Sequence, residues 1–476
     1  MKLGVSNSGN GTTPSVGVLK AGTSGSLTYS IVANAGNERS SSSNLIMDQA
    51  EDGTGNQISS RNTVERYSAT TRHVNIAPQL GWKLDGADKF TWGALAESRV
   101  VDWVRQRRET DIVGGPTDYP INDWLSNSNT VTARTDATWS HPTQSGAQLD
   151  VKLGANYQKR SISFRFLGFD DQGSLLLNRD VPSNATDTSL TSTGKYKTSI
   201  GQDHQVDAGW DGALTRRIER RQQYDYGPSR SLYDTLDESY SADIRRLAFY
   251  VQDVWQVQER LSAYVGVRWE GLSTHVLGRT IDSVATDSGV VSPVAQLLWQ
   301  VPGSEKDQLR VSLARTYSAP TPQNLVPRRY TANNGNGPTN PDFQGNAGLR
   351  PEIAWGLDGA YEHYLGRNGL VSLSLYARSI KDVLVRSLFE ENGVWITTPT
   401  NAGSARTAGA TFEVKIPVRE LLSDDAPRID LRLSATRNWS KVSAVPAPNN
   451  RLPEQVPLTA NIGLDYTMTD AFSMGA

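Results

Sequence analysis

Cysteine is absent from this chain, so a hydrolytic site would have to combine histidine with serine or an acidic residue. The five histidines are His73, His141, His204, His275 and His363. A hydrolase would need one of them beside an activated nucleophile or a metal ion. No Gly-x-Ser-x-Gly or His-Glu-x-x-His pattern occurs, however. We therefore predict no catalytic residue, no metal site, no cofactor and no enzymatic activity.

Arginine gathers in two stretches that could bind an anion. The stretch "RRIERR" at 216–221 holds four arginines, and "VPRRYTANNGNGPTN" at 326–340 contains Arg328, Arg329 and Tyr330. Exposed arginine and tyrosine suit an anionic or aromatic ligand. We predict Arg328, Arg329 and Tyr330 as ligand-binding residues of an outer loop. The alternatives are a merely solvated loop at 326–340 and, for the arginines of 216–221, rim or lumen charges that pair with carboxylates or phosphates of a partner.

The elements that must position these residues are β-strands with one apolar face. In "LSAYVGVRWE", at 261–270, every second residue is apolar, and "VNIAPQLGWKL", "AQLDVKLGANY" and "GATFEVKIPV" repeat the pattern. Such alternation is typical of strands whose two faces meet different surroundings. No segment of comparable length has a helical period with caps at both ends. The sequence therefore predicts an all-β protein.

Short and long connections between these strands alternate along the chain. Tight connections occur at 141–146, 258–260 and 302–307. Long polar connections are expected at 37–72, 101–129, 225–243, 319–351 and 442–455. Alternating short turns and long loops are typical of up-and-down membrane barrels. We predict a large antiparallel up-and-down transmembrane β-barrel with about 19 strands and its apolar face towards lipid.

Composition agrees with this interpretation and excludes others. Lys plus Arg is 48 and Asp plus Glu is 50 among 476 residues, so no basic surface for nucleic acid is expected. No stretch approaches the roughly 18 consecutive apolar residues of a membrane helix. The alternative is a soluble β protein with its apolar face inward. Such a fold has no reason to sort its loops by length, and we find no repeat with a fixed period of about 20–50 residues.

Three stretches, in this order, resemble the barrel of TonB-dependent outer-membrane receptors. "LAFYVQDVWQVQERLSAYVGVRWEG" resembles a hairpin of that family with a Tyr-Val-Gln-Asp-x-Trp strand and a Gly-Val-Arg-Trp return. After "ARTYSAPTPQNLVP", the residues Leu349–Glu352 fit the Leu-x-Pro-Glu that ends a long outer loop. "NAGSARTAGATFEVKIP" resembles an Asn-x-Gly-x-Ala passage. The resemblance is sharpest over 240–420.

This resemblance implies a receptor in the outer membrane of a bacterium that takes up a scarce nutrient, foremost a ferric siderophore. It implies as partners the TonB–ExbB–ExbD complex, the nutrient ligand, outer-membrane lipid and lipopolysaccharide. It also implies a monomer. The arginines of 216–221 would then face carboxylates of a plug domain or lipopolysaccharide phosphates as well as a ligand.

The family's barrel has 22 strands around an N-terminal plug domain. We therefore expect residues 1–476 to form one incomplete barrel domain, with no plug, no TonB-contacting segment and the last strands missing. Such a partial copy would not carry out coupled import alone. The alternatives are a soluble or plugless β-barrel with a structural or pore role and, less favoured, an outer-membrane hydrolase.

Overall fold

The chain folds almost wholly into β-strands, as the sequence predicts. A computed structural model describes residues 2–8, 11–52, 54–84, 87–115, 117–229, 231–279, 283–332, 334–366, 368–423, 425–448, 450–469 and 472–475. The strands of the main sheet are β1 Lys2–Ser8, β2 Gly11–Ser24, β3 Leu27–Glu51, β4 Gln57–Lys83, β5 Lys89–Val113, β6 Ile121–Pro142, β7 Gln148–Phe169, β8 Leu175–Ile200, β9 His204–Tyr226, β10 Leu232–Asp237, β11 Tyr240–Gln258, β12 Leu261–Gly278, β13 Val284–Gln300, β14 Asp307–Ser318, β17 Glu352–Leu365, β18 Gly369–Lys381, β21 Ser404–Pro417, β22 Arg428–Val442, β23 Leu458–Thr469 and β24 Phe472–Gly475. A small sheet contains β15 Arg329–Tyr330, β16 Asp342–Gln344, β19 Leu384–Glu391 and β20 Val394–Asn401, and the two helices are α1 Pro322–Leu325 and α2 Val418–Leu422. Neither helix is long and apolar enough to cross a membrane, and no other helix occurs in these ranges.

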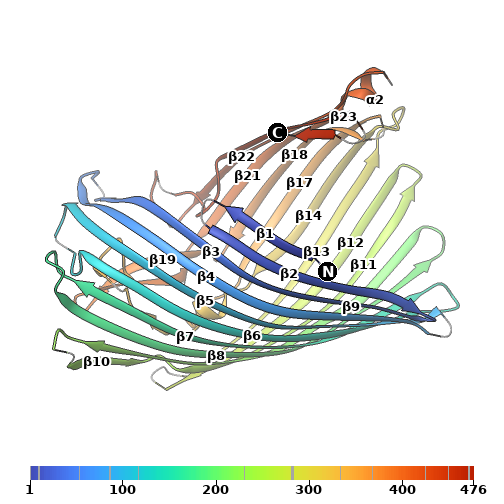
Figure 1. Cartoon of the computed structure of the whole chain (residues 1–476). Helices are drawn as coiled ribbons and strands as arrows, with labels where there is room; N and C mark the ends of the chain where they lie inside the picture. Colours follow the sequence, from blue (N-terminus) through green and yellow to red (C-terminus); the bar gives the residue numbers. More distant parts are fainter. Residues whose placement is uncertain are drawn as a thin grey trace.

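The main sheet is antiparallel, and strands that follow one another in the sequence are its neighbours (Figure 1). It contains 20 strands, but β9 pairs with β11 along 204–219 and with β10 along 222–226. Strands β10 and β11 therefore share one position, which leaves 19 positions. The prediction of about 19 up-and-down strands is confirmed.

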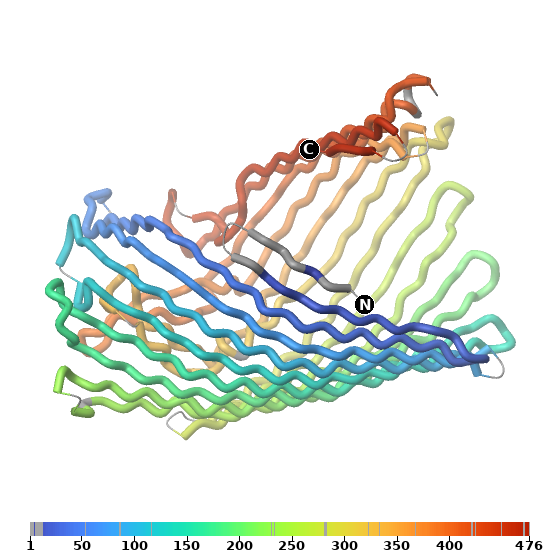
Figure 2. Tube along the Cα trace, viewed as in Figure 1, coloured from blue at the N-terminus to red at the C-terminus, as the bar shows by residue number. Residues whose placement is uncertain are grey.

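The sheet curls round so that its two edges approach each other across an opening (Figures 1 and 2). Within the described ranges, β1 pairs only with β2, and β24 pairs only with β23. The tight turns gather at one end, on the right in Figure 1, which we name the turn end. The opposite end, where the strands project furthest, is the loop end.

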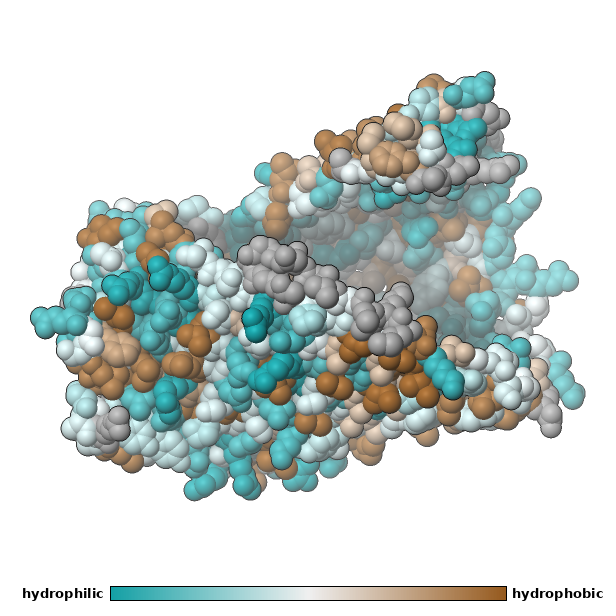
Figure 3. All heavy atoms as spheres, in the orientation of Figure 1, coloured by the Kyte–Doolittle hydropathy of each residue, from teal (hydrophilic) through white to brown (hydrophobic). Residues whose placement is uncertain are grey.

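The alternation of side chains separates two faces. On β12, Val265, Val267 and Trp269 point outward and are 55 %, 41 % and 42 % exposed, while Thr274 and Val276 are buried on the inner face. Apolar side chains on the outer surface are visible in Figure 3. On β11, the outward residues from Trp255, beside a tight turn, to Leu247 are apolar except for Asp253. We name this zone of the outer surface the apolar band.

The expected loops 37–72 and 101–129 prove to be mainly strand. Strands β3 and β4 pair up to Glu51 and Gln57, and β5 and β6 extend to Val113 and from Ile121. Beyond the apolar band both faces carry polar residues, so the apolar–polar alternation fades. The ladder of backbone hydrogen bonds continues regardless of that pattern.

Two segments predicted as single strands are broken. The expected strand 370–388 divides after Lys381, and 394–417 divides after Asn401. Backbone angles φ of 55° at Asp382 and 71° at Gly403 mark the breaks. A left-handed residue cannot continue a strand, so β19 and β20 leave the main sheet and join β15 and β16 at the loop end.

A testable consequence concerns Gly194 of β8. A Cβ atom there would overlap the ring of Trp210, whose Nε1 donates a hydrogen bond to Ser192 Oγ at 3.1 Å. We expect Gly194→Ala to lower the free energy of unfolding by about 1–3 kcal/mol, because the ring must move. The control is Gly359→Ala, where no heavy atom lies within 4 Å of the added carbon. Urea unfolding of the detergent-folded protein measures both, and equal changes would contradict the prediction.

Candidate ligand-binding surface inside the barrel

The connection between β14 and β17 folds across the inside of the loop end (Figure 1). Its strand β16 pairs with β20 in parallel, so two connections build one small sheet there. Val326 packs against Tyr240, Ala242 and Val276 of the inner wall. Thr286 Oγ1 also donates a hydrogen bond to the carbonyl oxygen of Ala347 at 3.0 Å. This connection is therefore docked on the wall and is not simply solvated.

Arg328 is buried, contrary to its expected exposure. It is 4 % exposed, and its Nη1 lies 2.7 Å from Glu219 Oε1, while its Nε lies 3.6 Å from Glu238 Oε1. Its guanidinium also lies over the Tyr330 ring, 3.8 Å from the centroid. Arg328 thus joins the connection to β9 and to the residue that follows β10.

Arg329 and Tyr330 are partly buried and belong to β15. The Nε of Arg329 lies 2.7 Å from Asp342 Oδ2. Asp342 also accepts hydrogen bonds from the backbone N–H of Ala332 and from Asn336 Nδ2, both at 2.9 Å. Ligand binding by Arg328, Arg329 and Tyr330 stays a prediction.

The stretch 216–221 divides by face. Arg217 and Arg221 point inward with Glu219, and Arg216 points outward, where it lies 3.8 Å from Asp243. Arg217 contacts Asp187 and Glu219, each at 2.8 Å, and Arg221 pairs with Glu238. The inward arginines therefore serve structural ion pairs.

The pKa values of this network follow from burial and neighbouring charge, and the network lies beyond the apolar band. Burial alone would raise the pKa of the Glu219 carboxyl, but the Arg328 and Arg217 guanidiniums outweigh it and hold this pKa below its ordinary value. Burial raises the pKa of Tyr240 to about 12. Burial and the charge of Arg328 lower the pKa of Arg221 to about 10. At neutral pH all three groups keep their ordinary charge states.

A second inward surface lies on β4 to β7 near the same end. We name it the aromatic–arginine wall; it comprises Tyr67, Trp103, Arg105, Arg107, Trp124 and Phe164. The guanidinium carbon of Arg105 lies 5.7, 5.7 and 5.6 Å from the ring centroids of Tyr67, Trp103 and Trp124. That of Arg107 lies 5.1 Å from Trp124. Both cations are thus within cation–π range.

The wall carries an excess of positive charge. Glu65 is the acidic partner of both arginines, 3.4 Å from Arg105 and 2.8 Å from Arg107. Arg105 remains 31 % exposed and Arg107 25 % exposed. Partly exposed rings around partly exposed guanidiniums can stack on a planar ligand and attract a negative one.

Sequence reasoning misses this wall because it predicts a long polar connection at 101–129. The signal was present in "DWVRQRRE", where Trp103, Arg105 and Arg107 recur at every second position. An extended strand places such residues on one face. Register then aligns Arg105 with Tyr67 on one side and Trp124 on the other.

The histidines do not form a hydrolytic site in the described part of the chain. Nδ1 of His141, His204 and His363 lies 2.6–2.7 Å from an aspartate, and all three pairs are at the turn end. His275 Nε2 lies 3.2 Å from Ser283 Oγ, but no carboxylate there contacts its other nitrogen. The arrangement gives no support to the hydrolase alternative.

Removing Arg328 should free the docked connection. In Arg328→Ala, Glu219 and Glu238 would stay buried without their shared cation, which costs about 3–5 kcal/mol. We expect a comparable loss of hydrogen-exchange protection over residues 322–346. The control Arg329→Ala removes an arginine that is 33 % exposed and leaves Asp342 its hydrogen bonds from Ala332 and Asn336, so it should cost only about 1 kcal/mol. Equal protection in the two variants would show that Arg328 does not hold the connection.

Low pH should also free the docked connection, because it protonates Glu219. Because the folded pKa of Glu219 lies below its ordinary value of 4.5, its stabilisation is complete above pH 4.5 and is lost as pH falls through the folded value. We expect pepsin to cleave 322–346 increasingly as pH falls below 4.5, when the rate is measured relative to an unfolded substrate at each pH. The Arg328→Ala variant should already be cleaved at pH 4.5, where the unsubstituted protein still protects 322–346. A relative rate that does not change with pH in the unsubstituted protein would contradict this assignment.

Solved structures share this fold. The chain aligns with the copper transporter OprC (TM-score 0.59, 15 % identity, covering 100 % of this chain and 66 % of that one). It aligns with the FrpB iron transporter from Neisseria meningitidis (0.60, 12 %, 98 % and 66 %) and with the ferric yersiniabactin uptake receptor FyuA from Yersinia pestis (0.59, 13 %, 97 % and 64 %). The chain therefore spans about two thirds of the length of these proteins.

Sequence comparison points the same way. No curated protein sequence matches the chain. The family model described as "TonB dependent receptor-like, beta-barrel" matches residues 59–475. This match includes most of the main sheet and the whole of the small sheet at the loop end. The chain therefore belongs to the TonB-dependent receptor β-barrel family.

Proposed function

We propose that this chain is the barrel of an outer-membrane receptor for TonB-dependent uptake of a scarce nutrient. The observation that carries the proposal is the family match over 59–475 together with the aromatic–arginine wall inside the loop end. The family is one of receptors and transporters, which fits the absence of enzymatic motifs.

In this proposal the apolar band faces lipid. About 9–11 residues of a tilted strand cross a bilayer, and the outward residues from Trp255 to Leu247 fall at the low end of that range. The turn end would then face the periplasm and the loop end the exterior. The docked connection between β14 and β17 would stand across the route of an entering ligand.

We propose a ferric siderophore with anionic, aromatic iron-binding groups as cargo. The positive excess and the exposed rings of the aromatic–arginine wall favour such a ligand. Arg329 and Tyr330, both partly exposed, remain proposed ligand contacts, and Arg328 would act by positioning Tyr330. The similar solved structures are named for copper, iron and ferric yersiniabactin, so the fold alone does not select a cargo.

Coupled import requires a plug domain in addition to the β-barrel. We propose that the intact receptor, of which this chain would supply residues 1–476, includes a plug domain that contacts the TonB–ExbB–ExbD complex. We further propose that the receptor acts as a monomer in the bacterial outer membrane.

Binding of ferric tris(2,3-dihydroxybenzoate) by the detergent-folded chain tests the cargo. We expect Arg105→Gln to weaken binding about tenfold, because a desolvated cation–π contact contributes up to about 2 kcal/mol. The control is Arg378→Gln on β18, outside the wall, because Arg378 is 32 % exposed and lies 5.4 Å from the ring of Tyr376 on the same strand. Quenching of tryptophan fluorescence reports binding. Equal affinity of the two variants would remove the wall from the binding site.

A further inference from the structure

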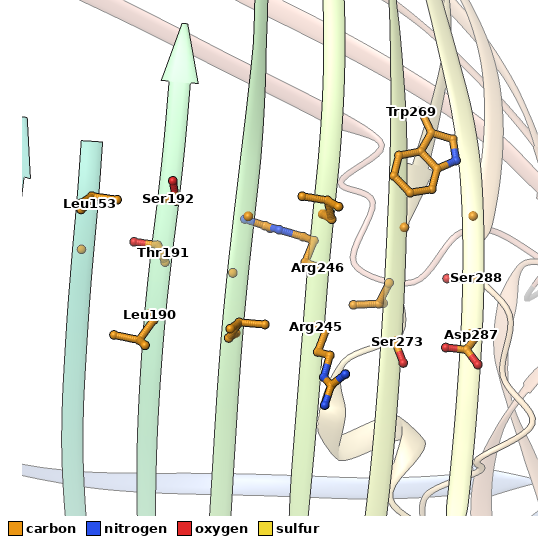
Figure 4. A pocket seen from close by; sticks show the side chains of 18 residues that line it. Leu153, Leu190, Thr191, Ser192, Arg245, Arg246, Trp269, Ser273, Asp287 and Ser288 are labelled. Carbon is orange, nitrogen blue, oxygen red and sulfur yellow. The ribbon is translucent and has the colours of Figure 1, made fainter. Parts of the chain in front are cut away.

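The outer surface of β8 to β13 carries a groove with a floor of small residues. Cross-strand register places Ser192, Gly212, Leu247, Gly271 and Gly289 in one row, side by side on consecutive strands. Leu247 stands between two slots, one over Ser192 and Gly212 and the other over Gly271 and Gly289. Figure 4 shows this pocket with Trp269 at one end and Arg245, Ser273 and Asp287 at the other.

An aromatic row closes the groove towards the turn end. Register places Trp210, Phe249 and Trp269 side by side. The rings of Phe249 and Trp269 are stacked, with centroids 6.2 Å apart and planes at 17°. A Cβ atom on Gly271 would lie 2.9 Å from the Trp269 ring, so the glycine lets this ring lie along the groove. Trp269, stacked on Phe249, therefore forms this end of the groove.

The opposite end of the groove is polar. Leu214, Arg245, Ser273 and Asp287 form the next row towards the loop end. Within the described ranges Arg245 has neither an ion pair nor a side-chain hydrogen bond, while Arg216 beside it lies 3.8 Å from Asp243. Arg245 is thus a free cation in the same row as the Ser273 hydroxyl and the Asp287 carboxylate. The hydroxyl and the carboxylate can form hydrogen bonds with sugar hydroxyls.

The position of Arg245 gives the depth of this polar row. It lies ten residues from Trp255 on β11, and both side chains point outward. About 9–11 residues of a strand cross a bilayer. If Trp255 marks the boundary at the turn end, Arg245 reaches the head groups on the loop side, and the two slots lie among the acyl chains just beneath.

We propose that this groove binds one lipopolysaccharide molecule, with acyl chains in the two slots and a phosphate of the sugar head group on Arg245. The inference rests on the proposed outer-membrane location with the loop end outward. A phosphorylated glycolipid fits better than a phospholipid, because Ser273 and Asp287 offer partners for sugar hydroxyls beside the cation. Leu247 separates two chains of the same molecule.

Two substitutions probe the two halves of the site. Arg245→Gln removes the cation; a basic residue at a membrane surface contributes about 1 kcal/mol, so binding should weaken about fivefold. Gly289→Val fills a slot, and the nearest heavy atom, Trp269 Nε1, lies 3.7 Å from the added Cβ, so the fold has room for it. Excluding about two methylene groups of a chain should weaken binding about tenfold.

Matched controls exist elsewhere on the same face. Gly359→Val adds the same side chain at an outward glycine of β17 with no heavy atom within 4 Å. Arg39→Gln removes an outward arginine of β3, away from the groove. Both controls should keep lipopolysaccharide affinity within about twofold of the unsubstituted chain, because neither residue lines the groove.

The experiment titrates purified lipopolysaccharide, and separately phosphatidylglycerol, into the delipidated full chain in detergent, with bound lipid counted by native mass spectrometry. The proposal expects tighter binding of lipopolysaccharide and losses confined to Arg245→Gln and Gly289→Val. Equal losses in the controls, or equal affinity for both lipids, would overturn it. Insertion of the unsubstituted chain into vesicles is measured in parallel. Insertion without lipopolysaccharide binding overturns the groove alone, whereas failure to insert overturns the proposed function and the groove with it.

Discussion

The ladder of backbone hydrogen bonds between neighbouring strands is the interaction on which the rest of this structure depends. In an apolar medium every backbone N–H and C=O must find a partner within the protein, and a curled antiparallel sheet supplies one from strand to strand. The ladder also fixes register, and register decides which side chains share a row. The aromatic–arginine wall on β4 to β7 and the outward groove on β8 to β13 are both rows of this kind, on opposite faces of the same sheet.

Buried ion pairs hold the connection between β14 and β17 in place at the loop end. The connection between β14 and β17 cannot rely on the main ladder, so it is held by a few contacts of high consequence. Arg328 bridges Glu219 and Glu238 in a buried setting, and Val326 adds apolar packing against Tyr240 and Val276. Such a pair is costly to break and costly to bury. It therefore specifies one position for the connection, and that position lies beside the proposed ligand surface.

The sequence was most informative where the two faces of a strand differ. Alternation around Val265 and Val267 placed β12 correctly, because lipid-facing and lumen-facing positions need different residue types. The same rule fails beyond the apolar band, where both faces of β3 and β4 are polar, and Trp103 and Arg105 of β5 lie in a stretch that it predicts as a loop. The burial of Arg328 was also beyond reach, since its acidic partners Glu219 and Glu238 lie about 90–110 positions away in the sequence. The alternation of residue types along a strand predicts which side chains share a face. Only the folded structure shows which residues from distant parts of the sequence come into contact there.

The measurement that tests this account most directly is a single-cysteine scan of β12. The chain has no cysteine of its own, so Tyr264→Cys, Val265→Cys, Val267→Cys and Arg268→Cys each introduce one label site. In vesicles, the account predicts that a fluorophore at 265 or 267 is quenched by brominated lipid and that 264 and 268 react with a water-soluble reagent. Quenching without a period of two, or no quenching by lipid at 265 and 267, would contradict it.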